Sequence, residues 1–408
     1  MASGYRAPLH RETGRGAWDS IRAFVFGLYL SSETDGEGSF LSAMGMQTLS
    51  EAKIAELLGV SLHTEQQHEH IPGLTISQVG GFGWELVQLL KTLLDETGKV
   101  LVNGGYPNLG SFVAEALKEG ARVAHEKADP AVAADVVLEQ VRCRDSIVGG
   151  NLHIQYADPS KTFQLVRAIP GFQDMSIVNN QRTYLGFFFL FRAKFSPPRA
   201  RIVSPLHSSP PLPFAAIYCF KKALFLVNAI AIRFAAKRGR DDAPSPFPIP
   251  HTSHLPVFAD NVLPSILIHL GVIDLASVTS TSSSTSAPLA SLFPAIDGGA
   301  ASDAAADPAL LLAAAPEPPP ARTTEAAGPI IEGPVLTPGQ SYVLRAAAID
   351  ACEHIVSHAH AMSAAGRGAP WLKDVTLPDL DIWLWAVAKD RADYRALPRF
   401  VLRNTPFF

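Results

Sequence analysis

The 408-residue sequence predicts a mainly α-helical fold, arranged as a single multi-helical domain over residues 17–408. Apolar residues recur at the three-to-four-residue spacing of helices along most of the chain. Stretches with the strict alternation of strands are scarce, and no segment repeats with a period of about 20–50 residues. Together these observations favour helices packed around one core.

The amino-terminal third contains the first group of expected helices. Leu41–Leu58 has apolar residues at helical spacing, with Ser50 as the N-cap of a helix over Glu51–Leu58. Trp84–Val102 is the most amphipathic segment, and its leucines share one face. We expect Gly98 to stop or interrupt this helix, because glycine weakens a helix interior.

Further helices follow towards the middle and the end of the chain. Leu109–Lys118 is expected to end at Gly120, and Asp129–Gln140 begins with a favourable Asp-Pro pair. The later helical segments are Tyr218–Ala236, Asn261–Ile273 and Ser341–Ala365, followed by a tail rich in tryptophan.

Three stretches interrupt this pattern. Residues 141–164 and 183–217 have no coherent helical or strand period, and we interpret them as insertions, either retained introns or lineage-specific loops. Residues 277–338 are dominated by Ser, Thr, Ala and Pro, and they have too few large apolar groups to offset the entropy of ordering. We therefore expect a disordered linker there.

Composition excludes several classes of protein. A net charge of −4 and a pI near 6.4 argue against a nucleic-acid partner. The three cysteines are widely spaced, which excludes a disulfide framework and a CxxC zinc site. The first 16 residues lack the apolar region of a signal peptide, and Lys221 and Lys222 interrupt the apolar stretch 213–236, so we expect no membrane span. These features predict a soluble, cytoplasmic protein.

Two sets of residues permit a binding site but do not require one. His354 and His358 are four residues apart, so on a helix they share a face and could bind a metal, although no HExxH motif is present. The glycines at 80–83 and 104–110 precede helices, where backbone N–H groups could receive a phosphate. We interpret the histidines as ordinary surface or hydrogen-bonded residues and the glycines as turn residues.

Charged residues within apolar segments form a third set. Asp260 precedes an apolar helix, Lys221 and Lys222 lie in a nearly all-apolar helix, and Asp381 precedes Trp-Leu-Trp. Buried charges are costly unless they are paired, so one reading is a structural Lys–Asp ion pair with Asp260 as a helix cap. The other is an apolar pocket in which a carboxylate meets a developing cation and a lysine orients an anionic group.

The motifs around these residues resemble those of a known family. Phe258-Ala259-Asp260-Asn261-Val262-Leu263-Pro264 leads into Ile268-His269-Leu270-Gly271, and Phe172-Gln173-Asp174 precedes Phe220-Lys221-Lys222-Ala223. Further matches are Leu94–Leu101, Gly110-Ser111-Phe112, Leu344-Arg345, Asp381–Trp385, Pro398 with Arg403, and Phe407-Phe408. In this order they resemble the queuosine salvage proteins, which are queuosine 5′-phosphate N-glycosylases.

The resemblance implies an all-helical fold similar to helical DNA glycosylases. It also implies a hydrolase that acts on queuosine 5′-monophosphate and releases queuine for salvage into tRNA modification. Asp260 would stabilise or attack the cationic sugar, and Lys221 would orient that carboxylate or hold phosphate. The residues that would bind substrate are Phe258, Asn261, Asp381, Trp385, Asp174 and Arg345. In this role Phe258 and Trp385 would stack on the deazapurine, and Asp381 would accept hydrogen bonds from it. We also expect no cofactor, no metal, no direct contact with nucleic acid and no membrane.

The chain departs from the family at several positions. Asn261-Val262 replaces Tyr-Arg after the aspartate, Ala229 stands where the family has an aspartate, and Val343 replaces the glutamate before Leu344-Arg345. An alternative function is therefore a catalytically lapsed homologue that binds a nucleotide, a base or a protein partner. A histidine-ligated metalloprotein is a third hypothesis.

Overall fold

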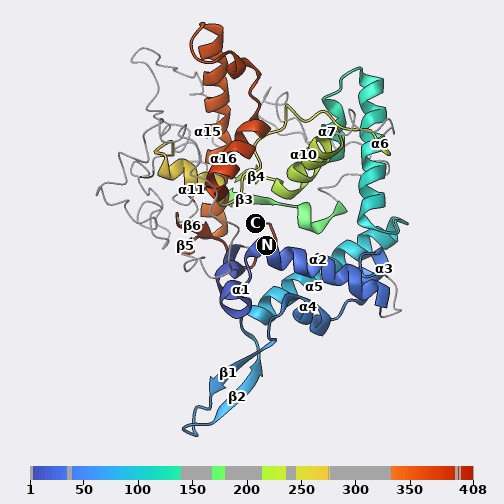
Figure 1. The fold of residues 1–408 in the computed structure, drawn as a ribbon, viewed down its shortest axis with the longest axis vertical. Helices are drawn as coiled ribbons and strands as arrows, with labels where there is room; N and C mark the ends of the chain where they lie inside the picture. The colour runs from blue at the N-terminus through green and yellow to red at the C-terminus, as the bar shows by residue number, and fades with distance from the viewer. Residues whose placement is uncertain are drawn as a thin grey trace.

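The structure is a computed structural model that describes residues 3–34, 39–138, 168–179, 214–235, 245–273, 275, 332–390, 394 and 397–407. These residues form a mainly helical protein, as predicted (Figure 1). The helices are α1 (Arg6–Thr13), α2 (Ala17–Thr34), α3 (Ala43–Thr48), α4 (Glu51–Leu58), α5 (Gly81–Asn103), α6 (Leu109–Lys127), α7 (Val132–Leu138), α10 (Lys221–Ala235), α11 (Val262–His269), α15 (Pro338–Ala364) and α16 (Leu377–Asp390).

Short strand pairs accompany the helices. β1 (His63–Gln67) pairs with β2 (Thr75–Val79) and β3 (Met175–Asn179) with β4 (Phe214–Tyr218), both antiparallel, and β5 (Glu332–Val335) runs parallel to β6 (Arg399–Val401). The β1–β2 hairpin projects away from the helices at the bottom of Figure 1. The single turns η1 (Ser3–Tyr5), η2 (Pro170–Phe172) and η4 (Pro370–Asp374) are 3₁₀ helices.

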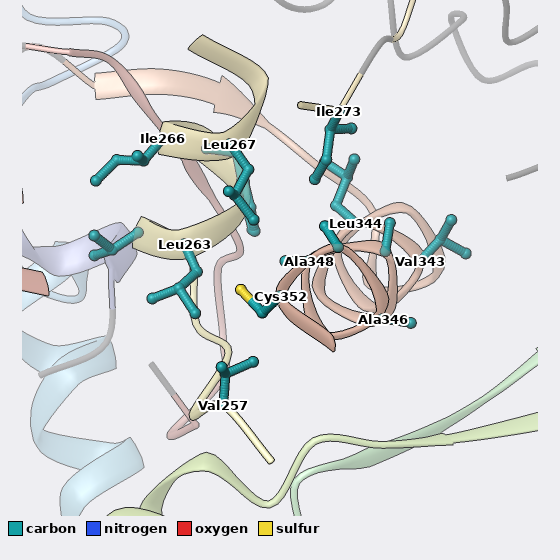
Figure 2. Close-up of a cluster of buried hydrophobic side chains, with 14 of the residues drawn as sticks. Val257, Leu263, Ile266, Leu267, Ile273, Val343, Leu344, Ala346, Ala348 and Cys352 are labelled. Carbon is teal, nitrogen blue, oxygen red and sulfur yellow. The ribbon is translucent and has the colours of Figure 1, made fainter. Parts of the chain in front are cut away.

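Buried apolar side chains gather into three main clusters. One joins α1, α2, α4 and α5, and a second joins α5, α6, α7 and α10. The third lies between α11 and α15 and extends to α16, with Leu263 and Leu267 facing Leu344 and Cys352 (Figure 2). Helix α11 is buried along nearly its whole length, so the segment before it, which includes Asp260, is fixed at the centre of the protein.

Side-chain hydrogen bonds set several helix starts, at or within three residues of the predicted positions. The Ser50 hydroxyl accepts a hydrogen bond of 3.2 Å from the backbone N–H of Lys53, which begins α4 as expected. The Asp129 carboxylate accepts one of 3.0 Å from the N–H of Ala131, just before α7. At α15, Thr337 and Gln340 form a reciprocal capping box, which places the helix start three residues before the expected Ser341.

The predictions for Gly98 and Gly120 are wrong. Both glycines lie inside helices that continue past them, α5 and α6. A Cβ atom at Gly98 would lie 2.6 Å from the carbonyl oxygen of Ala43, and one at Gly120 would lie 2.5 Å from that of Ala133. These glycines let α5 approach α3 and α6 approach α7, so they serve helix packing and do not end the helices.

The interrupted stretches lie largely outside the described residues. Residues 141–164, 183–213 and 277–331 are not among them. Residues 214–217, at the end of the second expected insertion, belong to β4, and residues 332–335, near the end of the expected linker, form β5. The helix expected from Tyr218 begins at Lys221, because Tyr218 is the last residue of β4. Within the described part of the chain, no helix combines the length and the apolarity that a membrane crossing requires.

Substitution of Gly98 tests the close approach of α5 to α3. We expect Gly98→Ala to lower the free energy of unfolding by about 2 kcal/mol, since the added methyl group must push the Ala43 backbone away. Gly339→Ala is the control, because a Cβ atom there meets nothing within 4 Å in the first turn of α15. That variant should be more stable than wild type by about 0.5 kcal/mol. Urea denaturation measures both, and equal effects would contradict the packing role of Gly98.

Candidate functional site

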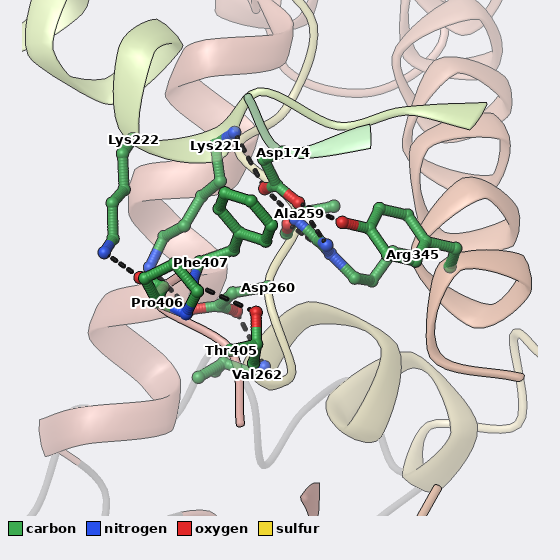
Figure 3. Close-up of polar contacts among 11 residues, drawn as sticks. Asp174, Lys221, Lys222, Ala259, Asp260, Val262, Arg345, Thr405, Pro406 and Phe407 are labelled. Carbon is green, nitrogen blue, oxygen red and sulfur yellow. Dashed lines mark hydrogen bonds and ion pairs between the residues drawn. The ribbon is translucent and has the colours of Figure 1, made fainter. Parts of the chain in front are cut away.

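Arg345 is the most deeply buried charged residue of the site, and it joins three segments of the chain. Its exposed fraction is 0%, and its guanidinium forms a two-pronged ion pair with Asp174, in which Nη1 lies 2.8 Å from Oδ1 and Nη2 contacts Oδ2. Its Nε donates a 3.0 Å hydrogen bond to the carbonyl oxygen of Ala259. The Tyr342 hydroxyl, one helical turn earlier on α15, donates a 2.9 Å bond to Asp174 Oδ1. Figure 3 shows this network beside the start of α10.

Asp174 also fixes the first residue of α10. Its carboxylate accepts a 3.3 Å bond from the backbone N–H of Lys221, and its carbonyl oxygen accepts bonds from the N–H groups of Cys219 and Phe220. Phe220 has a positive φ of 42°, a backbone conformation that residues other than glycine rarely adopt. The bonds to Asp174 hold this strained turn and thereby direct Lys221 towards Asp260.

Asp260 and Lys221 form an ion pair at the centre of the site. Lys221 Nζ lies 2.9 Å from Asp260 Oδ2, and the backbone N–H of Val262 donates a 2.7 Å bond to Oδ1. The Asp260 residue is 2% exposed. Burial alone would raise the pKa of Asp260, but the charge of Lys221 and these two hydrogen bonds outweigh it and hold the pKa below its usual value. Asp260 is therefore a buried carboxylate that stays ionised.

The indole of Trp385, on α16, completes this centre. Lys221 Nζ lies 5.0 Å from the centroid of the ring, and Lys389 Nζ lies 4.5 Å from it. Partial desolvation, followed by the positive charges of Arg399 and Arg6, lowers the pKa of Lys389 to about 8. Ammonium groups from α10 and α16 thus lie over one aromatic ring next to Asp260, and the charges of Arg6 and Arg399 act on Lys389.

Asp381, one helical turn before Trp385, is the second buried carboxyl group. It is 4% exposed, and its Oδ1 accepts a 2.9 Å bond from the backbone N–H of Phe258. Burial raises the pKa of Asp381 to about 7, and the nearby charge of Asp260 adds to the rise, while the bond from Phe258 opposes it. The two carboxyl groups therefore differ in protonation near neutral pH.

The remaining predicted site residues lie close by but point elsewhere. Phe258 is 1% exposed and packs edge-on against Phe225, with ring centroids 6.1 Å apart, so its ring belongs to the core. The Asn261 side chain donates a 2.9 Å bond to the carbonyl oxygen of Phe400. The structure thus brings Asp260, Lys221, Asp381 and Trp385 together. Arg345 and Asp174 bind the backbone on either side of this group, at Ala259 and at Lys221.

Two cavities lie near this centre without including it. The larger, of about 460 Å³, and the smaller, of about 230 Å³, are lined by neither Asp260, Lys221, Asp381 nor Trp385. Both cavities reach Pro406, which lies beside Lys221 and Lys222 in Figure 3. The carboxy-terminal segment Thr405–Phe407 therefore lies next to the Asp260–Lys221 pair.

Sequence reasoning missed three members of the site. No motif in the sequence distinguishes Tyr342, Lys389 and Arg399, because each lies in an ordinary helical or strand pattern. The spacing of Tyr342 and Arg345 places them on one helix face, which is the only pattern that could have indicated the first of them. Lys389 could be inferred only from its position four residues after Trp385 on α16.

The alternative sites have ordinary local structure. His360 contacts the carbonyl oxygen of Val375 at 2.8 Å, and His68 accepts a bond from the N–H of His70. Within the described ranges, no group of three or more His, Cys, Asp or Glu residues is arranged to hold a metal ion. Gly81 and Gly105 have positive φ values of 81° and 74°, as the interpretation of these glycines as turn residues expects.

Truncation of Arg345 tests the buried network. We expect Arg345→Met to lower the free energy of unfolding by about 3–5 kcal/mol, because Asp174 would remain as an unpaired buried charge. Tyr342→Phe removes one hydrogen bond to the same carboxylate and should cost about 1 kcal/mol. Chemical denaturation compares the two variants, and equal losses would show that the ion pair does not dominate this network.

The pKa of Asp381 predicts a dependence of stability on pH. Its carboxyl group has a folded-state pKa of about 7, above its ordinary value, so the folded state binds the proton more tightly than the unfolded state. This contribution is fully present below about pH 4 and is lost as the pH rises to 7. Relative to wild type, Asp381→Asn should therefore gain stability over this interval, by up to about 4 kcal/mol.

Denaturation of wild type and Asp381→Asn at pH 4, 5.5 and 7 measures this difference, and groups common to both proteins cancel. A constant difference between Asp381→Asn and wild type at all three pH values would contradict the raised pKa.

Comparison of the chain with protein-family models gives no match, and comparison with curated proteins gives no significant relative. The contacts of Asp260, Lys221 and Asp381, and the resemblance of the surrounding motifs to the queuosine salvage proteins, are the grounds on which a function is proposed.

Proposed function

We propose that this chain hydrolyses the N-glycosidic bond of queuosine 5′-monophosphate and releases queuine and ribose 5-phosphate. The observation that carries the proposal is the pair of buried carboxyl groups with opposite pKa shifts, Asp260 lowered and Asp381 raised to about 7. Environments that separate the pKa values of two neighbouring carboxyl groups are typical of glycoside hydrolysis, which needs one ionised and one protonated group.

Asp260 supplies the ionised group. Cleavage of the bond between the sugar and the base leaves positive charge on the anomeric carbon and ring oxygen. A desolvated carboxylate stabilises such a charge strongly, because little solvent screens the interaction. Lys221 and the N–H of Val262 hold the Asp260 carboxylate in place, so it is already oriented before the cation develops.

Asp381 supplies the protonated group. Below its pKa of about 7 it can donate a proton or a hydrogen bond to the departing base, which takes the electron pair of the broken bond. Water then adds to the anomeric carbon and provides the hydroxyl group of ribose 5-phosphate, and the proton that the water loses replaces the one taken up by the base. Above this pH Asp381 accepts hydrogen bonds instead, so base release should slow as the pH rises past 7.

Lys221 and Lys389 over Trp385, with Arg399 close enough to act on Lys389, favour a substrate that carries phosphate and an aromatic base. Lys389 and Arg399 have no carboxylate in hydrogen-bond contact among the described residues, and Asp260 is the acidic group that acts on both. A phosphate monoester would balance this positive charge. The indole of Trp385 offers an aromatic face for the base, once an ammonium group over it moves to the phosphate.

A second candidate function is binding without catalysis. The side chain of Asn261, which replaces the family's tyrosine, is held by the carbonyl of Phe400, and the two described cavities do not reach Asp260. A homologue that binds queuine or its nucleotide without cleaving it would have these features.

Release of queuine from queuosine 5′-monophosphate, followed by mass spectrometry, tests the proposal. We expect turnover by wild type and a loss of about 10²–10³-fold in Asp260→Asn, which removes the charge but keeps the shape. Asp374→Asn is the matched control, because this exposed carboxylate lies on η4. Queuine binding without turnover would favour the second candidate, and neither binding nor turnover would reject both.

A further inference from the structure

The side chains that line the smaller cavity are apolar apart from a single amine. It has a volume of about 230 Å³ and lies between α2, α4 and α5, lined by Ile21, Phe24, Leu58, Leu86, Leu89, Leu90, Leu93, Lys222 and Pro406. Seven of these residues have large apolar side chains. Lys222 is the one that can carry a charge, and neither Asp260 nor Lys221 lines the cavity. The cavity is therefore distinct from the site proposed for hydrolysis.

The amine of Lys222 has fewer partners than its protons require. Among the described residues, Nζ donates one hydrogen bond, to the carbonyl oxygen of Pro406, and it pairs with no carboxylate (Figure 3). An ammonium group has three protons to donate, and water or a ligand must accept the others. An apolar cavity with one such cation in its lining suits a ligand with an apolar body and a single anionic head.

We propose that this cavity binds a small monocarboxylate, whose carboxylate pairs with Lys222 and whose hydrocarbon part lies among the leucines of α5. The size of the cavity limits the ligand to a short aliphatic chain or a single aromatic ring, because drug-sized sites begin at about 300 Å³. A dianionic head such as phosphate would leave one negative charge unpaired, which the apolar lining cannot balance.

The charges around Lys222 agree with this assignment. Burial, and then the charge of Lys221, lowers the pKa of Lys222 to about 8, and the carboxylate of Asp174 opposes this shift without contacting the amine. Glu85 and Glu96 line the larger cavity, which shares Leu89, Leu93 and Pro406 with the smaller one. They disfavour an anion in the larger cavity, so a carboxylate should enter with its head at Lys222.

Titration calorimetry of the full chain with hexanoate tests the proposal, with hexanol and hexylamine as probes of the same length. We expect hexanoate to bind with one-to-one stoichiometry and hexanol about tenfold more weakly, because the charge-assisted bond to Lys222 is lost. Hexylamine should not bind. Equal affinities for hexanoate and hexanol would overturn the proposal.

Variants test whether Lys222 is responsible for the binding of hexanoate. Lys222→Met keeps the length of the side chain but removes its charge, so hexanoate should lose its advantage over hexanol. Lys99→Met, an exposed lysine on α5, should bind as wild type does. Leu90→Phe fills the cavity and should weaken both hexanoate and hexanol. Unchanged hexanoate binding by Lys222→Met would overturn the proposal.

Measuring the affinity of wild type for hexanoate at several pH values tests the role of Lys222 even if the Lys222→Met variant does not fold. Hexanoate stays ionised between pH 7 and 9, while the free amine of Lys222, with its pKa of about 8, loses its proton. The affinity should therefore fall about tenfold across this interval. A constant affinity would contradict the role of Lys222. Because these measurements need no catalysis, they stand or fall independently of the proposed hydrolase activity.

Discussion

The buried ion pair between Arg345 and Asp174 is the interaction on which the site depends. Removing both charges from water is costly, and only good geometry and further hydrogen bonds offset that cost. Here the two-pronged contact, the Tyr342 hydroxyl and the carbonyl of Ala259 provide them. The carbonyl of Ala259 immediately precedes Asp260, and Asp174 holds the backbone N–H of Lys221. Both members of the Asp260–Lys221 pair are therefore positioned by the same buried network.

The helical class and many of the helices could be predicted from the sequence, because the period of apolar residues directly reflects a buried face. The ends of helices were harder to predict. Gly98 and Gly120 look like helix ends by local preference, but tertiary contacts with the backbone of Ala43 and Ala133 decide their role. The β1–β2 hairpin was missed because His63–Gln67 is almost entirely exposed, so its sequence has no alternation of buried and exposed residues.

The candidate site was partly visible in the sequence for a physical reason. Asp260, Lys221 and Asp381 are charged residues in apolar surroundings, and such residues are rare unless they are paired or functional. Their partners could not be predicted, because Arg345 and Asp174 are 171 residues apart and no local pattern links them. The sequence also gave no indication that Phe258 would be in the core or that Asn261 would turn to Phe400, since both depend on how α16 and β6 pack around the segment before α11.

The balance of charge is the strongest physical reason to regard this region as a site and not only as a structural ion pair. Asp260 and Lys221 neutralise each other, and Asp174 neutralises Arg345. Lys389 then remains as a cation over the same indole; after desolvation, the charges of Arg399 and Arg6 lower its pKa, and the charge of Arg6 also lowers the pKa of Arg399. Arg399 is buried, and a core arranged for stability alone would gain by replacing it with an apolar residue of similar size. An anionic ligand next to Trp385 would convert this repulsion into attraction, which gives a reason for both cations to lie beside Asp260.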